Sequence, residues 1–288
     1  MMQTKDIQIR DPFVVLEEGV YYLFGSTDKD IWQSRGVGFD VYTSSDLTAW
    51  EGPYAAFRPE PDFWSEQNFW APEVYRYNGA YYMFATFKPK AGRRGTAVLR
   101  SESLLGPFTL WSDGPVTPAE WECLDGTLYI DPAGNPFMVF CHEWQQVKDG
   151  EICAMPLTRD LCTAAGEPSL LFRATEAVWV RELAGRDPGN FVTDGPFLWI
   201  TDSGALVLLW SSFGAEGYCI GIARSKTGAI AGPWVQAPKP LFAKDGGHGM
   251  LFRSKEGKLY LTIHRPNKTP DERALFIALT DKDLTAEV

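Results

Sequence analysis

The sequence lacks a long hydrophobic run. Its longest apolar stretch is about six residues, from Ala205 to Trp210, whereas a helix needs about 20 apolar residues to cross a bilayer. A membrane-spanning helix is therefore excluded. The first residues also lack the apolar segment that a secretion signal requires, so we expect a cytoplasmic protein, unless a leader was removed from it.

Cysteine and positive charge are also scarce. The five cysteines are odd in number and form no CxxC pair, which disfavours a disulfide framework and a zinc site. Acidic residues (37) outnumber basic ones (27), which gives a net charge of −10. Binding to nucleic acid needs a clustered basic surface that this composition does not supply. Phosphate-binding and dinucleotide-binding glycine motifs are absent as well.

What the sequence does contain is a pattern that occurs five times. Each copy has a polar residue, a short apolar strand, a turn with glycine and a second strand rich in aromatic or branched residues. This pattern predicts a β-hairpin. A second strand–turn–strand element recurs between the copies, so that each unit contains four strands, and the units lie about 59 residues apart on average. The five copies begin at Arg10, Ala71, Leu124, Thr193 and Gly247.

Short strands in a four-stranded unit that repeats at this period predict an all-β fold, a five-bladed β-propeller around a central channel. We expect residues 1–288 to form this propeller as a single domain. A two-sheet sandwich would also have many short strands, but it would not repeat the same order five times. A two-domain α/β protein would need long helical segments, and helical periodicity is weak everywhere except between Ala174 and Ala184.

Titratable residues stand at the head of the first strand in all five units. Taken singly, several are typical turn residues, because Asp-Gly and Asp-Pro dipeptides favour turns. In a propeller, however, the inner strands run in the same direction, so we expect these five side chains to converge at one end of the channel. They are Asp11, Glu73, Asp125, Asp194 and His248.

Several carboxyls in one partly desolvated channel mouth cannot all ionise freely, so one can stay protonated while another is charged. Glycoside hydrolysis requires such a pair, because one group protonates the leaving oxygen while the other activates water. Aromatic residues close to the strand heads would provide faces for stacking sugars, although they could equally pack between blades. The candidates are Phe69, Trp70 and Trp144.

The ordered set of RDPF (10–13), WAPEV (70–74), LDGTLYID (124–131), TDGPF (193–197) and GGHGM (246–250) resembles glycoside hydrolase family 43 over essentially the whole chain. The resemblance implies a five-bladed propeller that inverts configuration and acts mostly on α-L-arabinofuranosides or β-D-xylosides. It implies that Asp11 is the general base and that Asp125 tunes and orients the acid. Glu73 and His248, together with the aromatic residues, would contact the substrate.

The general acid of this family is usually a glutamate in a Glu-Gly-Pro or Glu-Ala-Pro sequence, and the matching residue here is Asp194. The aspartate places its carboxyl about 1–1.5 Å further back, and a shift of that size can lower a rate on the order of 10²-fold. Asp194 remains our candidate for the acid. Glu182 and Glu73 are the substitutes that the sequence offers.

His248 matches a family histidine that lines the central cavity, where some members hold a calcium or sodium ion through water. The resemblance therefore implies a structural cation near His248, although a single histidine is not enough for a site built directly from protein ligands. No other cofactor is expected.

The leading hypothesis is an inverting, exo-acting glycosidase that removes arabinofuranosyl or xylosyl units from plant-polysaccharide oligosaccharides. A second hypothesis keeps the fold but changes the sugar, for example to galactofuranose. A third is a carbohydrate-binding propeller without catalysis, which only Asp194 in place of glutamate supports. A protein-interaction propeller would not need acids at its strand heads. Oligosaccharide is the expected partner, with neither nucleic acid nor membrane, and the sequence leaves the oligomeric state open.

Overall fold

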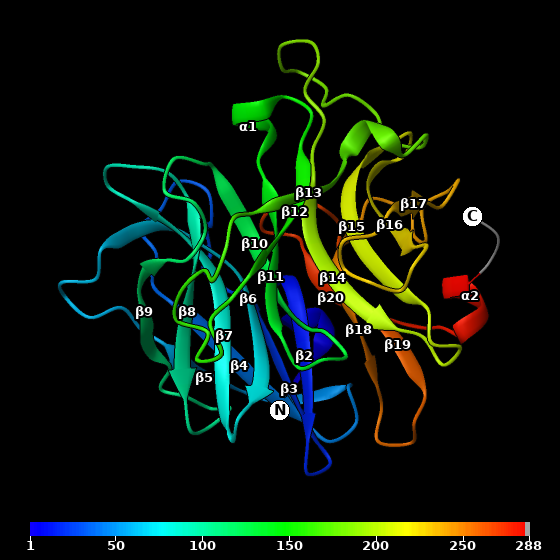
Figure 1. Cartoon of the computed structure of the whole chain (residues 1–288). Coiled ribbons are helices and arrows are strands. Elements are labelled where there is room, and N and C mark those ends of the chain that lie inside the picture. Colours follow the sequence, from blue (N-terminus) through cyan, green and yellow to red (C-terminus); the bar gives the residue numbers. More distant parts are fainter. Residues whose placement is uncertain (286–288) are drawn as a thin grey trace.

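The computed structural model describes residues 1–285, and within them the chain is almost entirely β-sheet. Figure 1 shows five twisted sheets arranged around a central axis, as the repeat predicted. We number these sheets blade 1 to blade 5 in chain order. The five-bladed β-propeller is thus confirmed, and no helix in the described part of the chain is long and apolar enough to cross a membrane.

Each blade is an antiparallel meander that begins with its innermost strand. Blade 1 contains β2 (Arg10–Glu17), β3 (Val20–Ser26), β4 (Phe39–Ser44) and β5 (Ala49–Phe57), and β1 (Met2–Gln3) pairs with the outer edge of β5. Blade 2 contains β6 (Ser65–Tyr77), β7 (Ala80–Pro89), β8 (Gly95–Ser101) and β9 (Thr109–Pro115). Blade 3 contains β10 (Cys123–Ile130), β11 (Pro136–His142), β12 (Glu151–Pro156) and β13 (Ser169–Arg173).

The last two blades follow the same order. Blade 4 contains β14 (Asp194–Ile200), β15 (Leu206–Gly214), β16 (Gly217–Ser225) and β17 (Trp234–Gln236). Blade 5 has three strands in the described residues, β18 (Gly247–Arg253), β19 (Leu259–Arg265) and β20 (Arg273–Ala278). Where a fourth strand would follow, the chain forms the short helix α2 (Asp281–Thr285).

The other helical elements are short and lie in the connections. They are η1 (Thr4–Asp6), α1 (Trp144–Val147) and η2 (Ala174–Glu176). The helical periodicity between Ala174 and Ala184 thus yields only the single turn η2, and the rest of that segment is irregular. In Figure 1 this long connection and α1 rise above the blades on the same side of the molecule.

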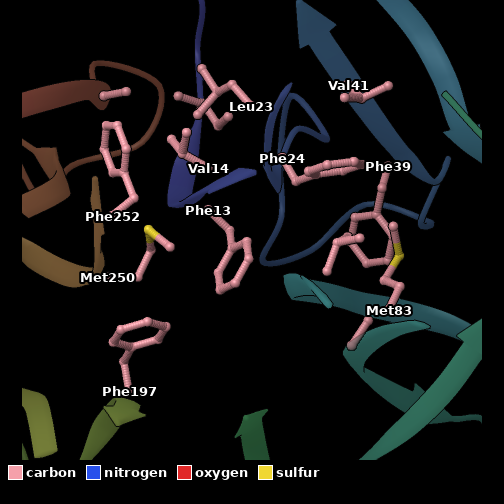
Figure 2. Close-up of a cluster of buried hydrophobic side chains, with 14 of the residues drawn as sticks. Phe13, Val14, Leu23, Phe24, Phe39, Val41, Met83, Phe197, Met250 and Phe252 are labelled. Atoms are coloured by element: carbon pink, nitrogen blue, oxygen red, sulfur yellow. The ribbon is translucent and has the colours of Figure 1, made fainter. Parts of the chain in front are cut away.

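Apolar side chains fill the space between blades and close the channel below its mouth. Phe13, Phe197 and Met250 are all buried and project toward one another from β2, β14 and β18 (Figure 2). The rings of Phe13 and Phe197 make an edge-to-face contact with centroids 6.1 Å apart. This plug leaves the polar strand heads above it as the floor of an open mouth.

Candidate active site

A β-bulge interrupts all five inner strands at the same place. In every blade one extra residue is inserted between two paired positions of the first and second strands, for example between Arg10 and Phe13 on β2. Each bulge contains a residue with positive φ, between 45° and 56°. Bulges redirect side chains, and they are common beside active sites. The five residues with positive φ are Asp11, Ala71, Asp125, Gly195 and His248.

The prediction that the five strand-head residues occupy equivalent positions is therefore wrong for two of them. Glu73 lies two residues after the bulge residue Ala71, and Asp194 lies one residue before the bulge residue Gly195. The first titratable residue of a strand does not reveal where the extra residue of the bulge is inserted. Asp194 still lines the channel mouth, whereas Glu73 lies one layer deeper.

The backbone amides of the bulge residues link neighbouring blades. In four of the five cases the amide donates to a side chain on the second strand of the preceding blade. Within its own blade, each of these acceptor residues pairs with the inner-strand residue that comes just before the bulge residue. The four bonds run from Asp11 to His264 Nδ1 (3.2 Å), from Ala71 to Ser26 Oγ (2.8 Å), from Asp125 to Thr86 Oγ1 (2.9 Å) and from His248 to Ser211 Oγ (2.8 Å).

The junction between blades 3 and 4 differs from the other four. The matching position on β11 is Cys141, opposite Leu124, and a thiol is a weak acceptor. The amide of Gly195 donates instead to Oδ2 of Asp125, at 3.0 Å. A carboxylate of the channel mouth therefore replaces the side-chain acceptor at this one junction.

Most of the predicted site residues line one cavity of about 380 Å³ at the end of the channel where the inner strands begin. Asp11, Asp125 and His248 reach it from the bulges, and Asp194 reaches it from the first residue of β14. Two predicted aromatic residues, Trp70 and Trp144, also line the cavity. The convergence that the strand heads predicted is present for these residues.

Asp11 is the carboxyl that stays ionised most readily. Burial alone would raise its pKa, but the charges of His248 and Arg10 more than offset that effect, so the pKa of Asp11 lies below its usual value. His248 Nδ1 lies 3.2 Å from Asp11 Oδ1, and the Ser26 hydroxyl donates to Asp11 Oδ2 at 2.6 Å. Asp11 is therefore a charged, firmly held acceptor.

His264 remains neutral beside this carboxylate. Burial and the nearby charge of Arg10 lower the pKa of His264 to about 3. Its Nδ1 accepts the amide hydrogen of Asp11, so the proton of the neutral ring is on Nε2, which donates to Asn267 Oδ1 at 3.1 Å. Arg10 donates to the same oxygen at 2.7 Å. This network fixes the backbone on which Asp11 stands.

Asp125 and His248 face each other across the mouth. Burial raises the pKa of Asp125 to about 7. The charge of His248 lowers this pKa, whereas the negative charges of Asp194 and Asp11 raise it further. His248 Nδ1 lies 3.7 Å from Asp125 Oδ2. Burial would lower the pKa of His248, but Asp11 and Asp125 outweigh it and the net shift is upward. His248 thus lies between two carboxyls whose negative charge favours its protonated form.

Asp194 receives a hydrogen bond from the Tyr218 hydroxyl to Oδ2, at 3.0 Å, and burial raises its pKa. Glycine follows it because a Cβ atom at position 195 would lie 2.6 Å from Cδ2 of His248. The φ of +49° at Gly195 alone does not require glycine, since non-glycine residues adopt a similar φ at the other four bulges. The Asp-Gly pair therefore serves the packing of His248 as well as the turn.

Two predicted substrate-binding residues are not in the cavity wall. Phe69 is 2% exposed and packs among buried rings, with its centroid 4.9 Å from that of Phe87, so it belongs to the core. Glu73 is buried in the layer below the mouth, where it accepts a hydrogen bond from Tyr75. Burial raises the pKa of Glu73 to about 7. Proximity to a strand head did not reveal to which side these side chains point.

Several further cavity residues were missed, and four of them bring charge or an aromatic ring beside the predicted ones. Trp32, from the loop after β3, is 46% exposed and lies under Arg10, whose guanidinium carbon is 5.1 Å from the ring centroid. Arg94 stacks in the same way on Trp70 at 4.8 Å. Glu143 follows β11 directly. Except for Arg10, these residues lie in connections between strands, outside the fivefold pattern. There only the aromatic and charged composition of the loops could have indicated a role in the site.

A metal site built from protein ligands does not fit the residues that the structure describes, since no group of three or more His, Cys, Asp or Glu side chains among them is arranged to hold an ion. His248 Nδ1 is directed toward Asp11 and Asp125. The calcium or sodium ion that the family resemblance implies would be held through water, and it stays a prediction.

Comparison with known proteins agrees with this geometry. The sequence model of the family described as Glycosyl hydrolases family 43 matches residues 5–280. The solved endo-arabinase of Bacteroides thetaiotaomicron VPI-5482 is 41% identical, with 97% of each chain covered and a TM-score of 0.90. The α-L-arabinofuranosidase of Lactobacillus brevis, 18% identical, shares the fold over 97% of this chain and 94% of its own, with a TM-score of 0.76.

Among curated proteins, the extracellular endo-alpha-(1->5)-L-arabinanase 1 of Bacillus subtilis (strain 168) is 24% identical over 173 residues. That alignment spans 56% of this chain and 52% of the relative, or about half of its length. The family match, in contrast, extends through all five blades and includes every carboxyl of the cavity. The chain therefore belongs to glycoside hydrolase family 43, and it is a glycosidase that hydrolyses O-glycosyl bonds.

Proposed function

We propose that this protein cleaves α-1,5-linked L-arabinan within the polysaccharide chain, with inversion of configuration. The observation that carries the proposal is its similarity to an endo-arabinase, which extends over 97% of both chains at 41% identity. The curated relative is also named an endo-acting enzyme on α-1,5-linked arabinan. The exo-acting removal of single arabinose or xylose units, which the sequence suggested, remains the alternative outcome of the test below.

The charge states of the channel mouth suit a single displacement. Asp11, ionised and held by Ser26, takes a proton from water as the water oxygen bonds to the anomeric carbon. The bond from that carbon to the leaving oxygen breaks at the same time, and a second carboxyl must protonate the leaving oxygen. Asp125 tunes the electrostatics, and Asp194 occupies the position of the family's acid. Inversion follows because water enters opposite the leaving group.

A neighbouring hollow supports binding of a longer substrate. It is lined by Lys29, Asp30, Ser34 and Pro270, and it shares Trp32 and Thr269 with the main cavity. The exposed ring of Trp32 at the boundary offers an apolar face of the kind on which a sugar stacks. A substrate that crosses Trp32 would occupy both hollows, as internal cleavage requires.

The test uses linear, debranched α-1,5-arabinan with wild type and with Asp11→Asn as the inactive control. We expect a ladder of oligosaccharides in chromatography, and by proton NMR the first-formed anomer should be inverted. Release of arabinose alone would establish exo action. Activity only on xylosides or galactofuranosides would move the specificity to another sugar, and binding without release would identify a non-catalytic propeller.

A further inference from the structure

Four acidic side chains line the main cavity, and one of them has no role so far. Asp11, Asp125 and Asp194 were expected from the strand heads, but the fourth is Glu143. The substitutes that the sequence offered for the acid are elsewhere. Glu73 lies below the mouth, and Glu182 is exposed and bonds the amide of Gly189 in its own loop.

Glu143 is held firmly at the wall of the cavity. It lies between the end of β11 and the first turn of α1, and only 4% of the residue and 6% of its side chain are exposed. Its amide donates to the carbonyl oxygen of Glu122 at 2.8 Å, and its Oε1 accepts a hydrogen bond from Gln145 Nε2 at 3.1 Å.

The second oxygen of Glu143, Oε2, faces the charge of Arg94 and makes no hydrogen bond among the described residues. It is buried, and a guanidinium nitrogen of Arg94 lies 3.2 Å away at an angle unsuited to such a bond. Burial raises the pKa of Glu143 to about 7, against the opposing charge of Arg94, and the nearby Asp194 raises it further. Glu143 thus combines a carboxyl oxygen that makes no hydrogen bond among the described residues with a pKa near neutral pH.

Asp194 is less well placed for the same task. Its side chain is one methylene shorter than glutamate, and its Oδ2 already accepts a hydrogen bond from Tyr218. Asp194 instead contributes negative charge beside Glu143, which favours the protonated form of that group.

We propose that Glu143, and not Asp194, is the carboxylic acid that protonates the leaving-group oxygen. The assignment rests on the hydrolytic function proposed above. As the glycosidic bond breaks, its electron pair goes to the leaving oxygen, which takes the proton from the Glu143 carboxyl group. The entering water gives its proton to Asp11. Arg94, 3.2 Å away, then stabilises the Glu143 carboxylate until it regains a proton from solvent.

The test compares leaving groups that need a proton with one that does not. Glu143→Gln and Asp194→Asn are assayed on a linear arabino-oligosaccharide and on 2,4-dinitrophenyl α-L-arabinofuranoside. If Glu143 is the donor, Glu143→Gln should lower kcat on the oligosaccharide about 10²–10⁴-fold, keep activity on the aryl glycoside within about 10-fold, and lose the basic limb of the kcat–pH profile. Asp194→Asn should lower kcat/KM on both substrates to a similar extent.

Glu122→Gln is the matched control, because Glu122 faces the same arginine at 3.9 Å but does not line the cavity. It should change neither the ratio of the two activities nor the pH profile. Glu143→Gln with wild-type kcat on the oligosaccharide would overturn the proposal, and so would Asp194→Asn alone showing the donor's signature.

A wrong substrate assignment would give a different result from a wrong choice of acid. If wild type cleaves another glycoside and not arabinan, the substrate assignment is wrong, and the same pair of leaving groups on that sugar still decides between Glu143 and Asp194.

Discussion

The amide of the bulge residue has one kind of partner at four blade junctions and a different one at the fifth. At four of them the bulge amide is bound by a neutral side chain from the second strand of the preceding blade, such as Thr86 or Ser211. Between blades 3 and 4 the equivalent residue is Cys141, and the amide of Gly195 binds Asp125. The side-chain acceptor that the second strand supplies at the other four junctions, a hydroxyl or the imidazole of His264, is missing here, and this leaves one amide available to the active site.

The largest effect should come from removing the charge at this exceptional junction. Asp125→Asn keeps an oxygen that accepts the Gly195 amide but removes the carboxylate. We expect kcat to fall on the order of 10²–10³-fold, as for loss of one preorganised electrostatic group, while the melting temperature at pH 5 stays within a few degrees. Steady-state kinetics and thermal unfolding check this. A large loss of stability with little loss of kcat would mean that Asp125 is only a structural link.

A smaller effect should follow from making the exceptional junction like the others. In Cys141→Ser the hydroxyl would accept the Gly195 amide, and Asp125 would lose a donor that favours its charged form. Because a hydrogen bond to a charged group contributes about 1.5–3 kcal/mol, we expect kcat to fall about 10-fold and the pKa of Asp125 to rise further.

The kcat–pH profile of Cys141→Ser measures both changes. Cys153→Ser is the control, since Cys153 is equally buried in blade 3 but lies on β12, away from the junction. Identical profiles for wild type and Cys141→Ser would show that the thiol has no bearing on Asp125.

The five junctions should also differ in how they respond to pH. Burial raises the pKa of Asp125 from 3.8 to about 7, so between these values the folded state holds a proton that the unfolded chain has lost. The stability from this group is full below about pH 4 and is lost as the pH rises through 7. His264, with a pKa of about 3, stays neutral over that range.

Asp125→Asn has no such proton to lose. Its melting temperature relative to wild type should therefore rise by several degrees between pH 4 and pH 8, which scanning calorimetry can follow. A difference that stays constant with pH would contradict the raised pKa.

The smallest effect should come from deleting one of the ordinary links. Thr86→Val preserves shape but leaves the Asp125 amide without its acceptor, so we expect the free energy of unfolding to fall by about 1–2 kcal/mol, measured by denaturant titration. Thr262→Val is the control, because the Thr262 hydroxyl is buried and has no hydrogen-bond partner among residues 1–285. Equal losses in both variants would show that the Thr86 bond contributes nothing.

The repeat predicted the fold because each hairpin carries its own local signal, an alternating strand on either side of a glycine turn. The same repeat placed Asp11, Asp125 and His248 at the strand heads, and in the structure they are the residues with positive φ in the bulges. It misplaced Glu73, because a bulge shifts the alternation of side chains by one residue and leaves no mark in a single sequence.

Residues outside the repeat were harder to predict. Glu143 and Arg94 come from connections between strands, and only the tertiary fold brings them to the cavity. Phe69 illustrates the opposite error, because it lies next to a cavity residue in sequence yet points into the core. The sequence pattern of one chain thus predicts which strands converge on the cavity. It is less able to predict which loop side chains also reach that cavity.

The contact between blade 5 and blade 1 has a consequence for how the enzyme is made. The amide of Asp11 meets His264 across 253 residues of sequence, and Arg10 meets Asn267 across 257. At about 5–20 residues per second, a ribosome needs roughly 10–50 s to travel that distance. During that time the proposed base exists without the partners that position it. Catalytic competence should therefore appear late and abruptly, when the last blade docks on the first, so that activity itself reports closure of the ring.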